Sequence, residues 1–283
     1  MLILDLNQIM ISSIITQLGN HTNTPLEEDL VRHIVLNTIR SLKTKFSQYG
    51  EIVIACDDKN YWRRSIFPYY KGNRKKDREK SDIDWSSLFN NLNKIKQEIK
   101  DNFPYRVVQV HGAEADDIIA TLCENYGEIL NTSSGEKIMI LSGDKDFIQL
   151  HKYSNVSQYD PVHKKQIIDK DPIKYLEELI LKGDRGDGIP NILSPDNCLV
   201  EGQRQKPLTA KKIKDIIDQG ISKDLYENYT RNKRLIDFAM IPEQLQTQIM
   251  EDFASQSHKG RDKLFNYFVQ HKLKNLIEHI GEF

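Results

Sequence analysis

The chain has 283 residues, of which 39% are hydrophobic and 29% are charged, and its formal net charge is −1. This composition is typical of a soluble globular protein, and no apolar run approaches the roughly 18 residues of a membrane span, so we expect no contact with a membrane. The three cysteines are widely spaced, which argues against disulfides and zinc and favours a cytoplasmic location.

Five apolar runs predict strands, at residues 2–6, 51–57, 105–110, 137–142 and 155–159. Apolar residues at helical spacing predict helices over 26–48, 82–102, 114–126 and 171–182. Strands that alternate with helices indicate an α/β fold, in which a mostly parallel central sheet has helices on both faces. After about residue 185 the strand signals stop, and a smaller helical part follows. We therefore predict an α/β domain at 1–184 and a helical domain at 185–283.

Basic residues are unevenly distributed along the chain. Residues 59–80 hold nine Lys or Arg and two acids, and residues 203–234 hold nine and four. One such run is usually a solvated face, but two runs in a chain with acidic clusters indicate a polyanion partner such as nucleic acid. We interpret residues 59–82 as a basic arch, which is expected to be flexible without a ligand because residues 71–80 are almost all polar. The arch residues predicted to contact nucleic acid are Arg63, Arg64, Tyr70, Lys75 and Lys76.

Nine acidic residues form five clusters, and four clusters follow or end an apolar run. Side chains at the carboxyl ends of parallel strands meet at one edge of a sheet, and carboxylates that converge there repel one another unless a cation holds them. Oxygen-only ligand sets suit Mg²⁺ or Mn²⁺, and two such ions about 4 Å apart commonly cut phosphodiesters. The sequence therefore predicts a magnesium-dependent phosphoryl-transfer site. The nine residues are Asp5, Asp57, Glu114, Asp116, Asp117, Asp144, Asp146, Asp184 and Asp187.

Local structure alone explains some of these acids. Acids in the first turn of a helix favour its dipole, which accounts for one or two of Glu114, Asp116 and Asp117. Asp184 and Asp187 also fit an Asx turn around a glycine. Neither explanation covers five clusters in one chain.

Four motifs carry a resemblance to a known family, and they occur in the order YKGNR, AEADD, DKDFIQL and GDRGD. By these motifs the chain resembles the flap-endonuclease superfamily of structure-specific 5′ nucleases. The segments YWRR, LHKY, LKGD and LIDFAMIP resemble phage members and extend the likeness over nearly the whole chain. The resemblance implies 5′-3′ exonuclease and flap endonuclease activity on RNA–DNA or DNA duplexes, by a mechanism that uses two Mg²⁺ ions. It also implies a role in RNA primer removal during phage DNA replication.

The resemblance also implies roles for individual residues. Lys71 and Arg74 in YKGNR are similar to the catalytic arch cations that hold the scissile phosphate, and Tyr70 is expected to stack on the nearby base. Asp184 and Asp187 are similar to the ligands of the second ion. The other seven acids are similar to direct or water-mediated ligands.

The chain departs from the family pattern in two places. GDRGD is not followed by the usual glycine-rich hairpin that binds duplex DNA through a monovalent ion. The sequence therefore does not predict that ion site. A basic helix from Thr209 is expected to contact phosphates through Lys211, Lys212 and Lys214. The chain begins at its first predicted strand, so we do not expect clamp binding through an N-terminal segment. By analogy alone, the C-terminal helices are expected to contact the phage single-stranded-DNA-binding protein, and the enzyme is expected to be a monomer.

Three other functions fit the sequence less well. A metal-dependent single-strand ribonuclease domain lacks the arch and the basic helical tail. A haloacid-dehalogenase-like phosphatase needs a second Asp two residues after the first, where this chain has Asn7. A non-catalytic DNA-structure-binding protein is disfavoured because all nine acids are present.

Overall fold

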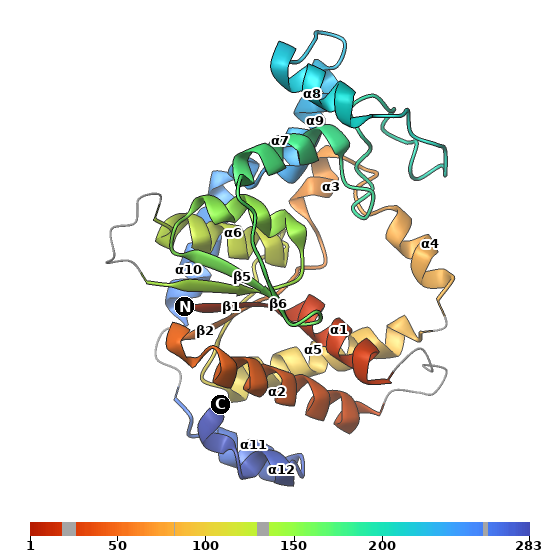
Figure 1. Cartoon of the computed structure of the whole chain (residues 1–283). Coiled ribbons are helices and arrows are strands. Elements are labelled where there is room, and N and C mark those ends of the chain that lie inside the picture. Colours follow the sequence, from red (N-terminus) through yellow and green to blue (C-terminus); the bar gives the residue numbers. More distant parts are fainter. Residues whose placement is uncertain (19–26, 82, 129–135, 257–259) are drawn as a thin grey trace.

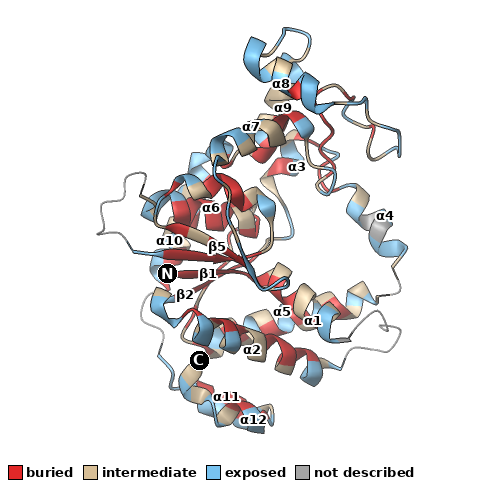
Figure 2. Cartoon of the chain, viewed as in Figure 1, coloured by how far each residue is buried: buried red, intermediate tan, exposed pale blue. Residues whose placement is uncertain are grey.

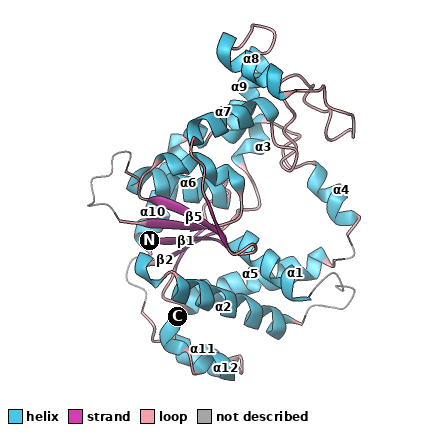
Figure 3. Cartoon of the chain, in the orientation of Figure 1, coloured by secondary structure: helices cyan, strands magenta, loops and turns pink. Residues whose placement is uncertain are grey.

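The structure is a computed structural model that describes residues 1–18, 27–81, 83–128, 136–256 and 260–283, without the side chains of Lys75 and Asp77. Its centre is a six-stranded sheet (Figures 1 and 3). The strand order is β3-β2-β1-β4-β5-β6. The strands are β1 (Leu2–Asp5), β2 (Ile52–Ala55), β3 (Arg106–Val108), β4 (Ile138–Leu141), β5 (Val156–Asp160) and β6 (Lys165–Ile167).

Strands β1 to β5 run parallel to one another, which confirms the predicted mostly parallel sheet. Strand β6 was not predicted, and it pairs antiparallel with β5 as a hairpin at the sheet edge. Its sequence, KQI, contains no apolar run, and its first two residues are exposed. Nothing in its local pattern therefore distinguishes it from a loop.

Helices cover both faces of the sheet, as predicted (Figures 1 and 2). Leu2 and Leu4 pack into one layer, and Met1 and Ile3 pack into the other, because side chains alternate along a strand. The first layer contains α1 (Leu6–Leu18), α2 (Glu28–Lys45), α5 (Trp85–Asn102), α11 (Leu264–Gln270) and α12 (Lys274–Ile277). The second contains α6 (Ala115–Tyr126) and α10 (Glu243–Ser255).

A third group of helices stands beside the sheet, at the top of Figure 1. It consists of α3 (Trp62–Ile66), α7 (Pro172–Lys182), α8 (Ala210–Gln219) and α9 (Tyr226–Ile236). Helices are thus confirmed after residue 185, but the end of the chain returns to the sheet. Phe253 packs in one main layer and Phe283 in the other, so the residues beyond 185 do not pack only among themselves.

The basic arch is present and carries a helix, α4 (Asn73–Glu79), which was not predicted. Arg, Lys and Glu are good helix formers even without an apolar face. Helix α4 joins the α3 side of the molecule to α5 and stands away from the sheet, with an exposed surface (Figures 1 and 2). Its base is held by Asn73, which donates to the Arg185 carbonyl at 3.0 Å, and by Lys76, which donates to the Val200 carbonyl at 3.0 Å. No helix in the described ranges is long and apolar enough to cross a membrane.

Candidate active site

The carboxyl edge of the parallel sheet brings several predicted acids together. Asp5 ends β1, Asp57 follows β2 and Asp144 follows β4. These three line a cleft of about 780 Å³ together with Asp116, which lies in the first turn of α6. Cationic side chains from the arch and from the helical layer line the same cleft: Lys59, Lys71, Arg74, Arg78 and Lys96. The cleft therefore combines carboxylates at the sheet edge with cations on its walls.

Polar neighbours fix the orientation of the two central carboxylates. Asp57 accepts hydrogen bonds from the Asn7 side chain at 2.6 Å and from the Ala115 amide at 2.8 Å. Asp5 accepts from the Gln8 amide at 3.1 Å and from the Ser142 hydroxyl at 3.4 Å. These partners are neutral, so they orient the carboxylates without neutralising their charge.

Burial and mutual repulsion raise the pKa of the acids around the cleft. Burial, followed by the nearby Asp57 and Asp144, raises the pKa of Asp5 to about 7. Burial and the charge of Asp144 also hold the pKa of Asp116 well above its usual range. Burial and the charge of Asp144 also hold the pKa of Asp146 well above its usual range. These carboxylates are crowded and insufficiently neutralised, which is the condition that a bound cation relieves.

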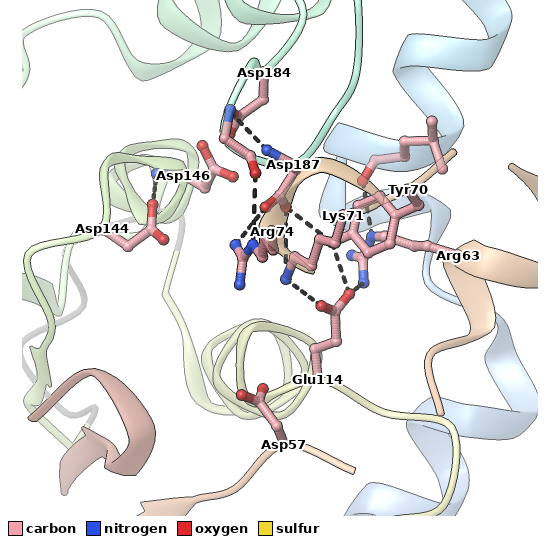
Figure 4. Close-up of polar contacts among 12 residues, drawn as sticks. Asp57, Arg63, Tyr70, Lys71, Arg74, Glu114, Asp144, Asp146, Asp184 and Asp187 are labelled. Carbon is pink, nitrogen blue, oxygen red and sulfur yellow. Dashed lines mark hydrogen bonds and ion pairs between the residues drawn. The ribbon is translucent and has the colours of Figure 1, made fainter. Parts of the chain in front are cut away.

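Asp184 and Asp187 occupy one glycine turn but differ in environment (Figure 4). Asp184 accepts from the backbone amide of Gly186 at 2.7 Å, and its pKa is raised by burial and by the charge of Asp187. Asp187 contacts Arg74 at 2.6 Å and the Lys71 ammonium at 3.6 Å. Although burial opposes ionisation, these two cations hold the pKa of Asp187 below its usual range.

Glu114 and Asp117 are buried and bound by cations of the arch base. Arg63 Nη1 lies 2.9 Å from Glu114 Oε2 and 2.7 Å from Asp117 Oδ1. The Lys71 ammonium contacts the other Glu114 oxygen. Asp117 also accepts from the Glu114 amide at 2.9 Å and from the Trp62 indole at 3.1 Å, so its oxygens face the protein interior.

The nine acids thus fall into two groups. Glu114, Asp117 and Asp187 are neutralised by Arg63, Lys71 and Arg74, whereas the other six form no ion pair with another described residue. Within the described part of the chain, no three His, Cys, Asp or Glu side chains lie close enough to hold one ion at the same time. The oxygen-only donor set and its unneutralised charge nevertheless fit hard divalent cations.

Two predicted contacts with nucleic acid do not agree with the structure. The Arg63 side chain is only 3% exposed and is held by carboxylates, so it does not face a phosphate. Tyr70 is 2% exposed, and its hydroxyl lies 2.8 Å from Glu114 and 2.9 Å from Asp187, so its ring does not face a base. Sequence reasoning placed both on the surface because YWRR and PYYK look like exposed mixed segments.

The other predicted contact residues are exposed where they are described. Arg64 and Lys76 are exposed in the arch, and Lys211, Lys212 and Lys214 are exposed on α8. The side chain of Lys75 lies outside the described atoms. Four site residues were missed, namely Asn7, which orients Asp57, and the cleft cations Lys59, Arg78 and Lys96. Arg78 lies within the predicted arch, whereas no motif marks Lys96.

Two family models together match residues 2–283 of the chain. The model of the 5′-3′ exonuclease N-terminal resolvase-like domain matches residues 2–177, and the model of the T4 RNase H C-terminal domain matches residues 173–283. The chain belongs to the 5′-3′ exonuclease family. Ribonuclease H of Enterobacteria phage T4 is 33% identical over 99% of this chain and 95% of its own length. A 5′-3′ exonuclease of Buchnera aphidicola is 31% identical over 56% of this chain and 53% of its own length.

Two solved structures share the fold of this chain. The T5 D15 protein co-crystallized with metal ions has a TM-score of 0.64 at 18% identity, with 91% of this chain and 99% of that chain covered. The T5 5′-exonuclease with bound zinc has a TM-score of 0.65 at 18% identity over the same shares. This 5′-3′ exonuclease family member is therefore a nuclease, as the motifs predicted, and the chain has the α/β architecture of those two proteins.

Proposed function

We propose that the protein is a structure-specific 5′ nuclease that uses two divalent metal ions, normally Mg²⁺, with Mn²⁺ as a substitute. It hydrolyses phosphodiesters near the 5′ end of RNA–DNA or DNA duplexes and removes 5′ flaps. The observation that carries this proposal is the cleft in which unneutralised carboxylates face the arch cations. Metal-bound structures of the T5 relatives and the flap endonucleases among the curated relatives support it.

The residues proposed to hold the ions are the six acids that have no neutralising partner among the described residues. Asp5, Asp57, Asp116 and Asp144 line the cleft, and Asp146 and Asp184 lie next to it. When bound, such ions lower the pKa of water and stabilise the charge on the leaving oxygen. Glu114, Asp117 and Asp187 contribute to the site through the arch cations that they bind.

The chain's own cations bind and orient the nucleic-acid strand. Lys71 and Arg74 line the cleft next to the carboxylates, where they hold the scissile phosphate. Lys59, Arg78 and Lys96 line the same cleft and contact neighbouring phosphates. The exposed lysines of α8 contact the duplex further away. The expected biological role is RNA primer removal in phage DNA replication within the infected cell, with the enzyme acting as a monomer and contacting the single-stranded-DNA-binding protein.

The test is single-turnover cleavage of a labelled 5′-flap substrate and a 5′-ended RNA–DNA hybrid, each with Mg²⁺ and with EDTA. We expect cleavage only with the metal, close to the flap junction or the 5′ end. A 3′-flap substrate of the same sequence is the control and should remain intact. Cleavage that is insensitive to EDTA, or equal on both flaps, would contradict the proposal.

A further inference from the structure

Arg63 occupies a position that the nuclease proposal leaves unexplained. It lies in the short helix α3 at the base of the arch, yet its guanidinium is buried and contacts two other segments of the fold. Nη1 reaches Glu114 and Asp117 at the start of α6, and Nε donates to the Leu235 carbonyl in α9 at 2.8 Å. The same guanidinium lies over the Trp62 ring, 4.7 Å from its centroid.

The two residues whose carboxylates Arg63 holds also close the beginning of α6. The Asp117 side chain accepts from the Glu114 amide at 2.9 Å, and the Glu114 backbone carbonyl accepts from the Asp117 amide at 3.1 Å. Asp116 lies between these residues in sequence and lines the cleft. The direction of Asp116 therefore depends on how Glu114 and Asp117 are held, and Arg63 holds both.

From this geometry, and on the basis of the proposed metal-dependent function, we propose that Arg63 is a positioning residue of the metal site. It orients the first turn of α6 so that Asp116 faces the cleft next to Asp144. Its planar fork of donors suits this task, because a lysine ammonium is a single point of charge and lacks the fork that reaches two carboxylates and a carbonyl. Arg63 itself does not line the cleft, and it does not face the bound nucleic-acid strand.

The test is the Arg63→Lys variant, which keeps the positive charge but loses the three-way contact. Mn²⁺ affinity is measured by calorimetry on the complete chain without DNA, so the readout does not depend on turnover. Loss of a residue that orients metal ligands typically weakens affinity by about 10- to 100-fold, and we expect at least about a tenfold loss. Binding of a flap substrate in EDTA should change by less than about twofold, because Arg63 is buried away from the strand.

Arg32→Lys is the matched control, because Arg32 is also a fully buried arginine that holds carboxylates. It contacts Glu98 at 2.8 Å and also pairs with Glu28 and Asp29, none of which is a proposed ligand. Arg32→Lys should lower the melting temperature without changing Mn²⁺ affinity. If Arg63→Lys folds and binds Mn²⁺ as the wild type does, or if both variants weaken it equally, the positioning role is refuted.

A second variant covers the case in which Arg63→Lys does not fold. Trp62→Phe removes the indole hydrogen bond to Asp117 and keeps an aromatic ring beside the Arg63 guanidinium. It should weaken Mn²⁺ binding by about tenfold, since a hydrogen bond to a charged group is worth about 1.5 kcal/mol and about 1.4 kcal/mol corresponds to a factor of ten. An unchanged affinity in this variant contradicts the inference. A wild-type chain that binds no Mn²⁺ would overturn the proposed metal site as well, so the two failures are distinguishable.

Discussion

Replacing Lys71 with methionine should destabilise the metal-free protein and increase its response to metal. Lys71 contacts Glu114 and lies 3.6 Å from Asp187, and its side chain is 9% exposed. Burial disfavours its charge, but the two carboxylates outweigh burial and raise its pKa above the usual range. Lys71→Met keeps most of the side-chain length and removes the charge, which leaves the carboxylates with fewer partners.

The magnitude follows from the remaining contacts. Breaking a buried ion pair by removing one partner typically costs about 3–5 kcal/mol. Glu114 keeps Arg63, and Asp187 keeps Arg74, so we expect the lower end, about 3 kcal/mol. With an unfolding entropy of about 2.1 cal/mol/K per residue, this corresponds to a fall in melting temperature of about 5 °C. A divalent ion supplies the missing positive charge, so Mg²⁺ should stabilise the variant more than the wild type.

The assay is thermal unfolding by calorimetry in EDTA and in several millimolar Mg²⁺. Lys145→Met is the control, because Lys145 lies between Asp144 and Asp146 in sequence but is exposed. It removes the same charge near other acids of the site without breaking a buried pair, so its melting temperature should change by less than about 1 °C. The reasoning fails if Lys71→Met melts like the wild type in EDTA, or if Mg²⁺ raises the melting temperature of both chains equally.

Three further predictions follow from the proposed site. Asp57→Asn or Asp146→Asn should nearly abolish cleavage while flap binding survives, and a variant that retains a tenth of wild-type turnover in saturating Mg²⁺ would count against a ligand role. Mg²⁺ or Mn²⁺ at a hundredfold excess over its dissociation constant should stabilise the wild type by about 2.7 kcal/mol, so a melting curve that does not move would argue against binding. Arg74→Ala should lower single-turnover cleavage by about 10²–10³-fold, whereas Lys76→Ala should affect only salt-dependent affinity, and equal small affinity losses in both would refute the distinction.

The parallel sheet could be predicted because its central strands are short apolar runs that are buried on both faces. LILD, IVIA and IMIL have this form, and acids follow them where the strands end. Helix α1 was not predicted, because it begins at Leu6 immediately after β1, and its sequence LNQIMISSIITQL has no charged residue to indicate a polar face. The apolar pattern thus identifies strands more readily than it separates a strand from the helix that follows it directly.

The sequence predicted which residues gather at the site better than it predicted how they pair. Spacing along the chain places the acids at one sheet edge, since each follows a local element. The orientation of Arg63 depends on Leu235, which is 172 residues away, and on Glu114, which is 51 residues away. No local pattern in YWRR shows which of its two arginines turns inward. Arg64 is exposed and Arg63 is buried, although both belong to the same short helix.

The opposite pKa shifts of Asp184 and Asp187 show where the site lacks positive charge. Both belong to one glycine turn, and burial raises the pKa of each. Lys71 and Arg74 contact Asp187 and reverse that effect, whereas the partners of Asp184 in the described structure are the amides of Gly186 and Asp187. Amides orient a carboxylate but add no net charge. The need for an external cation is therefore greatest on the side of Asp184 and the cleft, away from the arch base, where the protein already provides its own cations.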